Sequence, residues 1–92
     1  MDRGKVFLRV RQIVQNQLRA KDTAIIPEAH LMNDLGADSL DMVEMAMAVE
    51  EQFNISIDDS LTDRVQTVND LILVALGQEP ESEPRSLDVS ST

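Results

Sequence analysis

The chain contains no cysteine, no tryptophan and no tyrosine, and His30 is its single histidine. Without cysteine it has no disulfide framework, no thiolate zinc site and no thiol nucleophile, and one histidine cannot form a histidine cluster. Because Phe7 and Phe53 are the only aromatic residues, stacking on nucleic-acid bases is excluded as a binding mode. No apolar run is long enough for a membrane span, and the amino end lacks the apolar stretch of a signal peptide. We therefore expect a cytoplasmic protein of one small domain in these 92 residues.

Basic residues are scarce and unevenly placed. Eight Lys and Arg residues stand against 17 Asp and Glu residues, which gives a net charge of −9. Residues 1–21 hold six of the basic residues and a single acid, whereas residues 22–63 hold eleven acids and neither Lys nor Arg. Such a surface repels nucleic acid and anionic lipid, and it favours basic partners or a bound cation that relieves the repulsion. No residue is assigned as a metal ligand.

Two segments have the apolar spacing of amphipathic helices. Residues 5–19 repeat apolar side chains at steps of three and four, and residues 39–53 combine strong helix formers with the same period. In the second segment Leu40 and Met47 stand at the boundary of the apolar side, Glu50 interrupts it, and the other acids lie opposite. The apolar side of this segment comprises Met42, Val43, Met45, Ala46, Val49 and Phe53. Residues 20–38, which include Pro27 and Gly36, are predicted to form a long loop.

The rest of the chain adds a short helix and a third main helix. Asp58 and Asp59 are typical of the start of a helical turn through Asp63, and Thr67 is a good cap for a helix that ends near Gly77. Residues 78–92 have two prolines and few large apolar side chains, so we expect a disordered C-terminal tail. The predicted fold is all-α, a small antiparallel bundle of three main helices and one short helix, with a domain over residues 1–77.

One serine stands at the start of the second helix, in the sequence DLGADSLDMVE of residues 34–44. Ser39 could cap the helix, but Asp38 could cap it equally well and leave the serine free. A nucleophilic role needs an adjacent base. His30 is nine residues away on an apolar loop, and no basic side chain is nearby in the sequence. These surroundings favour a serine that another enzyme modifies.

This stretch resembles the acyl carrier proteins of type II fatty acid synthesis. DLGADSLDMVE continues into EMAMAVEEQFNISIDD, and the pattern D-x-V-x-T-V over residues 63–68 falls in register without gaps. The resemblance runs from about residue 6 to residue 77. It implies a non-catalytic, monomeric protein whose fold is the predicted helical bundle.

The resemblance also implies the site. Ser39 would carry a 4′-phosphopantetheine arm, transferred from coenzyme A by a phosphopantetheinyl transferase, and the thiol of the arm would hold acyl chains as thioesters. Asp38 and Leu40 belong to the attachment motif. Acids of the following helix would contact basic patches of the transferase and of fatty acid synthesis enzymes, and Met47 would add an apolar contact. The acids carried over are Asp38, Asp41, Glu44, Glu50 and Glu51.

Several alternatives remain at this stage. The nearest is an acyl carrier of a polyketide or specialised-lipid pathway, and a peptidyl or aminoacyl carrier is less favoured because so many acids surround the serine. From other classes come an acidic structural protein that never receives the arm, and a serine hydrolase, which the missing base disfavours. The apolar side of the second helix, with Met42, Met45 and Met47, would shelter an acyl chain or form ordinary core.

Overall fold

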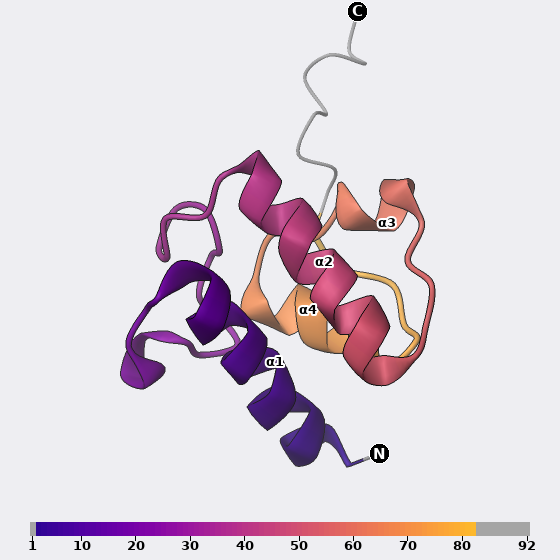
Figure 1. Cartoon of the computed structure of the whole chain (residues 1–92), viewed down its shortest axis with the longest axis horizontal. Coiled ribbons are helices and arrows are strands. Elements are labelled where there is room, and N and C mark those ends of the chain that lie inside the picture. Colours follow the sequence, from indigo (N-terminus) through magenta and orange to yellow (C-terminus); the bar gives the residue numbers. More distant parts are fainter. Residues whose placement is uncertain (1, 83–92) are drawn as a thin grey trace, which may run out of the picture.

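Four α-helices and one short 3₁₀ helix make up the secondary structure of residues 2–82, the part of the chain that the computed structural model describes (Figure 1). They are α1 (Arg3–Leu18), η1 (Asp22–Ala24), α2 (Ser39–Phe53), α3 (Asp59–Thr62) and α4 (Val68–Ala75). No strand occurs in this range, where a single isolated bridge joins His30 and Thr67. The predicted all-α bundle of three main helices and one short helix is confirmed. No helix in this range is long and apolar enough to cross a membrane.

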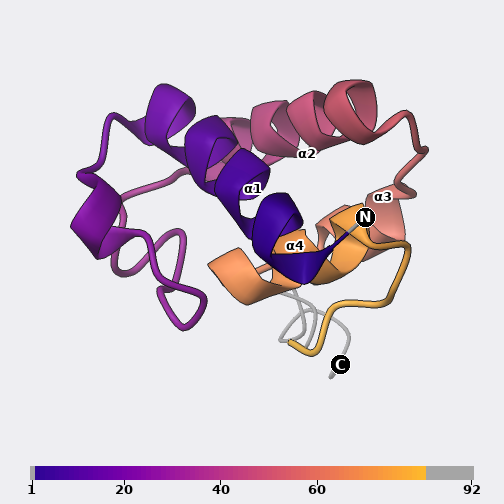
Figure 2. The same ribbon diagram turned by 90° about the horizontal axis from the view of Figure 1, so that it is seen from below.

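The three long helices share one core. Figure 2 shows α2 above, α4 below and α1 crossing in front, and α1 packs against both of the others. From α1 the core takes Val6, Val10, Ile13 and Val14, and nearly every residue of α4 is buried. Helix α1 begins two residues before the predicted start because Asp2 caps it by accepting a hydrogen bond from the Gly4 N–H at 3.2 Å.

Helix α2 has the predicted bounds, but its buried side is narrower than predicted. Met42, Met45, Ala46 and Val49 are buried, whereas Val43 is 47% exposed. The reason is that α3, which covers this side of α2, is only four residues long. The apolar spacing identified the helix correctly and overestimated how much of its apolar side is covered.

The long loop between α1 and α2 is fixed by backbone hydrogen bonds to the start of α4. The Leu31 N–H donates to the Gln66 carbonyl at 2.8 Å, and the Asn69 N–H donates to the Pro27 carbonyl at 2.9 Å. Ile25 and Leu31 are buried below this connection. The loop therefore carries the chain to the start of α2 along a defined path, and the 3₁₀ turn within it was not predicted.

Residues 78–82 differ from the disordered tail predicted over residues 78–92. After Gly77, which has a φ of +82° as expected of a helix-ending glycine, the chain folds back and Pro80 is buried. Arg64 and Asp70 bind this segment through hydrogen bonds. Composition alone gave no sign of these contacts, because their partners lie far back in the sequence. Residues 83–92 lie outside the described range.

Candidate functional site: the corner before α2

Asp38, not Ser39, caps α2. An Asp38 carboxylate oxygen accepts the Asp41 N–H at 2.8 Å, and an Asp41 carboxylate oxygen accepts the Asp38 N–H at 3.1 Å. This reciprocal capping box satisfies the backbone donors that a serine cap would otherwise serve. Ser39 is the first residue of the helix, its side chain is exposed, and its hydroxyl has no hydrogen-bond partner among the described residues. The cap of α2 therefore does not use the Ser39 hydroxyl.

Residues 34–39 form the corner that presents Ser39, and the loop before α2 holds this corner in place. Gly36 has a φ of +80°, a left-handed conformation that residues with a Cβ rarely adopt. Ala37 is buried, and its N–H donates to the Leu31 carbonyl at 2.9 Å. An Asp34 carboxylate oxygen accepts the His30 N–H at 2.8 Å, which closes the turn before it. Ser39 therefore projects from a helix tip whose approach is held by backbone and side-chain hydrogen bonds.

His30 does not serve Ser39 as a base. Its Nε2 lies 3.2 Å from the Gln66 side-chain oxygen, and its Nδ1 accepts the Asn33 N–H at 3.1 Å. Both ring nitrogens are thus occupied, one by the loop and one by Gln66 before α4. Within residues 2–82 no group of three or more His, Asp and Glu side chains is arranged to hold a metal ion. The corner offers an accessible hydroxyl without the base that an autonomous nucleophile needs.

An exposed apolar stripe runs along α2 from the serine. Leu40, Val43 and Met47 are 63%, 47% and 59% exposed, and their spacing of three and four residues places them on one side of the helix. Acidic side chains border this stripe. A shallow surface depression next to it is lined by Glu44, Met47, Ala48, Glu50, Glu51 and Asn54.

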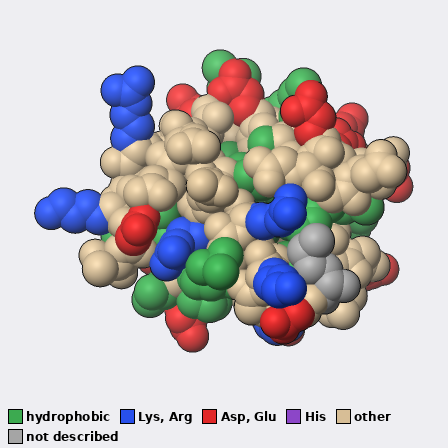
Figure 3. All heavy atoms as spheres, turned by 60° about the horizontal axis from the view of Figure 1, so that its bottom comes forward, with side chains coloured by type: hydrophobic (Ala, Val, Ile, Leu, Met, Phe, Trp, Pro, Cys, Tyr) green, Lys and Arg blue, Asp and Glu red, His purple; other side chains and the backbone are tan. Residues whose placement is uncertain are grey.

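The acids of α2 are not neutralised within the described chain. The Gln17 side-chain amide donates to Asp41 at 2.9 Å and to Glu44 at 2.5 Å. This hydrogen bond from Gln17, with a second from the Asp38 backbone, lowers the pKa of Asp41. Neither these two carboxylates nor Glu51 forms an ion pair with a described basic residue. In Figure 3 most Asp and Glu side chains lie along the upper and right edges, away from the Lys and Arg side chains at the front and left.

Residues 8–74 match the family described as the phosphopantetheine attachment site. The chain belongs to this family. Its domains receive 4′-phosphopantetheine as a covalent group and are generally non-catalytic carriers that interact with acyl chains and modifying enzymes. The match covers most of the described residues, from within α1 to within α4.

The corner fits the group that the phosphopantetheine attachment family carries. A phosphodiester to a side chain requires a hydroxyl that solvent and a second protein can reach, and Ser39 meets this condition. The amino end of α2 also favours a phosphate, because helix N–H groups and the helix dipole stabilise negative charge there. Of the motif residues predicted beside it, Asp38 is committed to the cap and Leu40 is exposed.

A groove between α2 and α3 lies beside the stripe and has a volume of about 140 Å³. It is lined by Val43, Ala46, Met47, Glu50, Ile57, Asp59 and Thr62. Met42 and Met45 are buried in the core, whereas Met47 lines the groove. Two of the three methionines are therefore packed as ordinary core, and the third lines a groove at the surface.

Glu50 explains why an acid interrupts the apolar side of α2. Its carboxylate accepts the Ile57 N–H at 2.7 Å and so holds the chain where it leaves α2 for α3. After this bond the Glu50 carboxylate still has free acceptor positions, because a carboxylate can accept several hydrogen bonds. The sequence gave no signal of this contact, because the partner is a backbone group whose position depends on the turn.

The cap assignment predicts the effect of Asp38→Ala. We expect the free energy of unfolding to fall by about 1 kcal/mol, because the Asp41 N–H loses its acceptor. Urea unfolding followed by circular dichroism measures the change, and Asp38→Asn, which keeps a side-chain oxygen, serves as the matched control. If Asp38→Ala were as stable as the wild type, Asp38 would not be the cap.

Proposed function

We propose that this chain carries growing acyl groups as thioesters on a 4′-phosphopantetheine arm attached to Ser39, and that it delivers them to the enzymes of type II fatty acid synthesis. The observation that carries the proposal is that the helix cap and the exposed hydroxyl belong to different residues. Asp38 and Asp41 satisfy the start of α2 between them, and the Ser39 hydroxyl is left exposed and unbonded. The chain itself is proposed to be a carrier without catalytic activity.

Attachment needs a second protein. The Ser39 oxygen would bond to phosphorus and displace the nucleotide portion of coenzyme A, and its proton must go to a base. No described side chain is placed to accept that proton, so a transferase is proposed to supply the base. Once attached, the arm supplies the thiol that a cysteine-free chain lacks.

The stripe and acids of α2 are proposed as the docking surface for that transferase and for synthesis enzymes with basic patches. Leu40 and Met47 supply exposed apolar area, and Glu44 and Glu51 supply charge that no described cation neutralises. Asp38, Asp41 and Glu50 add negative charge to the same surface. Asp38 and Asp41 also cap α2, and Glu50 also stabilises the turn between α2 and α3. Exposed ion pairs contribute little affinity each but speed encounter, which suits a carrier that many enzymes visit briefly.

Charge reversal tests this surface. We expect Glu44→Lys with Glu51→Lys to slow transferase loading by about tenfold at low salt, because steering depends on the sign of the local field. Asp41 is left intact, since its change would also disturb the cap. The rate of intact-mass gain is the measurement, at low ionic strength and again at high ionic strength, where the difference should shrink.

The matched control for this experiment is Glu28→Lys. Glu28 is an exposed acid that borders a separate depression with Arg3 and Asn69. We expect its reversal to leave the loading rate close to that of the wild type. Equal slowing per reversed charge in Glu28→Lys and in the double variant would mean that only total charge matters, and α2 would lose its role as docking surface.

The pathway has its own test. The protein loaded with the arm is offered malonyl-coenzyme A with a malonyl transferase of fatty acid synthesis. In parallel it is offered an amino acid with ATP and the adenylating enzyme of a peptide-synthesis system. We expect rapid malonylation and no aminoacylation. Aminoacylation alone would favour a peptidyl carrier. In a third reaction, with a malonyl transferase of polyketide synthesis, malonylation there and not by the fatty acid enzyme would favour the polyketide pathway.

A further inference from the structure

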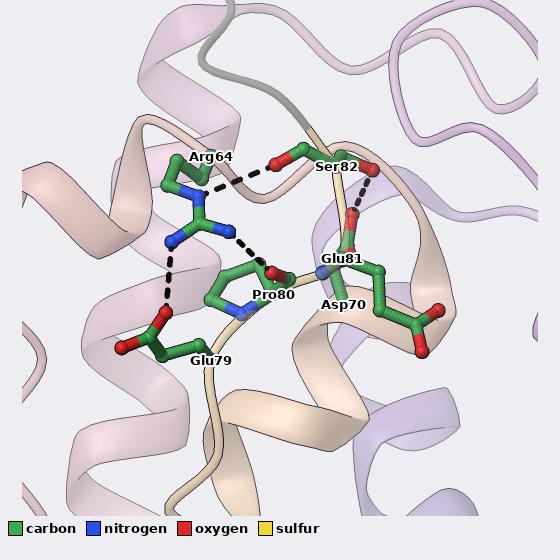
Figure 4. Close-up of polar contacts among 6 residues, drawn as sticks. All are labelled: Arg64, Asp70, Glu79, Pro80, Glu81 and Ser82. Carbon is green, nitrogen blue, oxygen red and sulfur yellow. Dashed lines mark hydrogen bonds and ion pairs between the residues drawn. The ribbon is translucent and has the colours of Figure 1, made fainter.

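The chain after α4 returns to the bundle and binds at two points. Figure 4 shows Glu79, Pro80 and Ser82 around the Arg64 guanidinium, with Ser82 also facing Asp70. Residues 79–82 are called the strap below. Pro80 is buried, so the strap contributes packing as well as polar contacts.

Arg64 is the first anchor, and it binds three residues of the strap. Its Nη2 donates to the Pro80 carbonyl at 2.7 Å, and its Nε donates to the Ser82 carbonyl at 3.3 Å. Its Nη1 forms a salt bridge with Glu79 at 3.2 Å. The planar guanidinium directs its donors to separate acceptors, which a lysine could not reproduce.

Asp70 is the second anchor. Its carboxylate accepts the Ser82 hydroxyl at 2.6 Å and the Glu81 N–H at 2.9 Å. The same carboxylate accepts the backbone N–H groups of Gln66 and Thr67, where it forms a capping box with Thr67 for α4. Asp70 is 1% exposed, and a buried carboxylate requires such donors. The strap therefore adds donors to a carboxylate that already fixes the start of α4.

Helix α3 is short and lies at the surface. It is four residues long and none of them is buried. The side chain of its N-cap residue, Asp58, makes no capping hydrogen bond. A helix of one turn is not stable without tertiary support. Arg64 follows α3 directly, and its N–H donates to the Leu61 carbonyl at 3.0 Å. The anchor of the strap thus belongs to the same turn of chain as α3.

We infer that the strap holds α3 against the bundle through Arg64 and thereby limits how far the groove between α2 and α3 opens. Asp59 and Thr62 of α3 form one wall of that groove. Arg64 is a positioning residue in this account. The consequence for acyl cargo rests on the function proposed above, whereas the restraint on α3 does not.

Hydrogen exchange of the full-length, cargo-free protein tests the restraint. Two variants loosen the strap from opposite sides. Arg64→Ala removes all three contacts with Arg64, and the double variant Glu79→Ala with Ser82→Ala removes the salt bridge to Arg64 and the hydroxyl bond to Asp70. We expect backbone amides of residues 58–65 to exchange about tenfold faster in both, since local opening becomes easier. Glu81→Ala is the matched control, because it removes a strap carboxylate that contacts Asn69 and not Arg64, and its exchange should match the wild type.

The inference requires the same result from the Arg64 variant and from the double variant of the strap. Faster exchange in Arg64→Ala alone would show that Arg64 stabilises its own turn without the strap. That result would overturn the inference that the strap restrains α3. Unchanged exchange in both would overturn it as well. Faster exchange in both and in Glu81→Ala would show a general loss of stability that does not depend on the contacts of Arg64, which also contradicts the inference.

A second readout addresses cargo. The arm is loaded with a butanoyl or a dodecanoyl group, and the melting temperature of each form is compared with that of the form carrying the arm alone. In the double strap variant we expect the longer group to raise the melting temperature more than it does in the wild type. The reason is that α3 moves away from α2 more easily and the groove opens further. Equal gains would contradict the limit on the groove. Failure of every variant to accept the arm would contradict the proposed function, while the exchange result would stand.

Discussion

Ser39→Ala is expected to abolish loading of the phosphopantetheine arm while leaving the fold unchanged. The substitution removes the only atom of the corner to which the phosphate can be joined. It removes no described hydrogen bond, because Asp38 and Asp41 satisfy the start of α2. The free energy of unfolding should therefore stay within about 0.5 kcal/mol of the wild type. Intact mass after incubation with coenzyme A, magnesium and a broad-specificity transferase is the measurement.

The control for this substitution is another exposed serine. Ser56 lies between α2 and α3 and has no described hydrogen-bond partner. Ser56→Ala should gain mass at the rate of the wild type. A mass gain in Ser39→Ala, or a loss of loading in both variants, would contradict the assignment of the arm to Ser39.

Asp70→Ala is expected to have the largest effect on stability, about 3 kcal/mol or more. The carboxylate accepts the N–H groups of three residues and one hydroxyl at a site that is 1% exposed. Its removal leaves those donors without partners, including the Thr67 N–H of the α4 capping box, and each buried unsatisfied donor costs about 1–3 kcal/mol. Urea unfolding measures the loss. Asp70→Asn keeps one acceptor oxygen and should lose less.

The same carboxylate predicts an acid dependence of stability. Burial raises the pKa of Asp70, but hydrogen bonds from Ser82, Gln66, Glu81 and Thr67 outweigh burial, and the net pKa lies below the ordinary value of 3.8. A group whose pKa is lower in the folded state stabilises the fold above its unfolded pKa, and this contribution is lost as the pH falls through the folded pKa. The wild type should therefore lose stability below about pH 4, and Asp70→Asn should show a shallower loss. Identical acid dependence would contradict this role.

The helices could be predicted because their signals are local. Thr67 begins α4 as its sequence predicts, and α2 keeps the predicted bounds since its apolar period and its start signal lie within one segment. Burial could not be predicted as well. Val43 has the right spacing for the core, but its exposure depends on the short α3, which leaves it partly uncovered.

The corner before α2 was predictable in position and not in detail. The sequence DLGADSLDMVE predicted the corner, but Asp38 and Ser39 are both good caps. Only the path of the backbone decides which one reaches the Asp41 N–H. Glu50 reads as one more surface acid, and its bond to the Ile57 N–H depends on the turn between two helices. The strap was missed because proline and glutamate are typical of disordered tails, while its anchors lie up to 18 residues away.

Tandem mass spectrometry of the loaded wild-type protein tests the central claim most directly. After loading with coenzyme A and a transferase, the protein is digested and the modified residue is located by fragmentation. The account predicts the phosphopantetheine group on Ser39 alone. A group on Ser56, Ser60 or any other hydroxyl, or a protein that gains no mass at all, would contradict it.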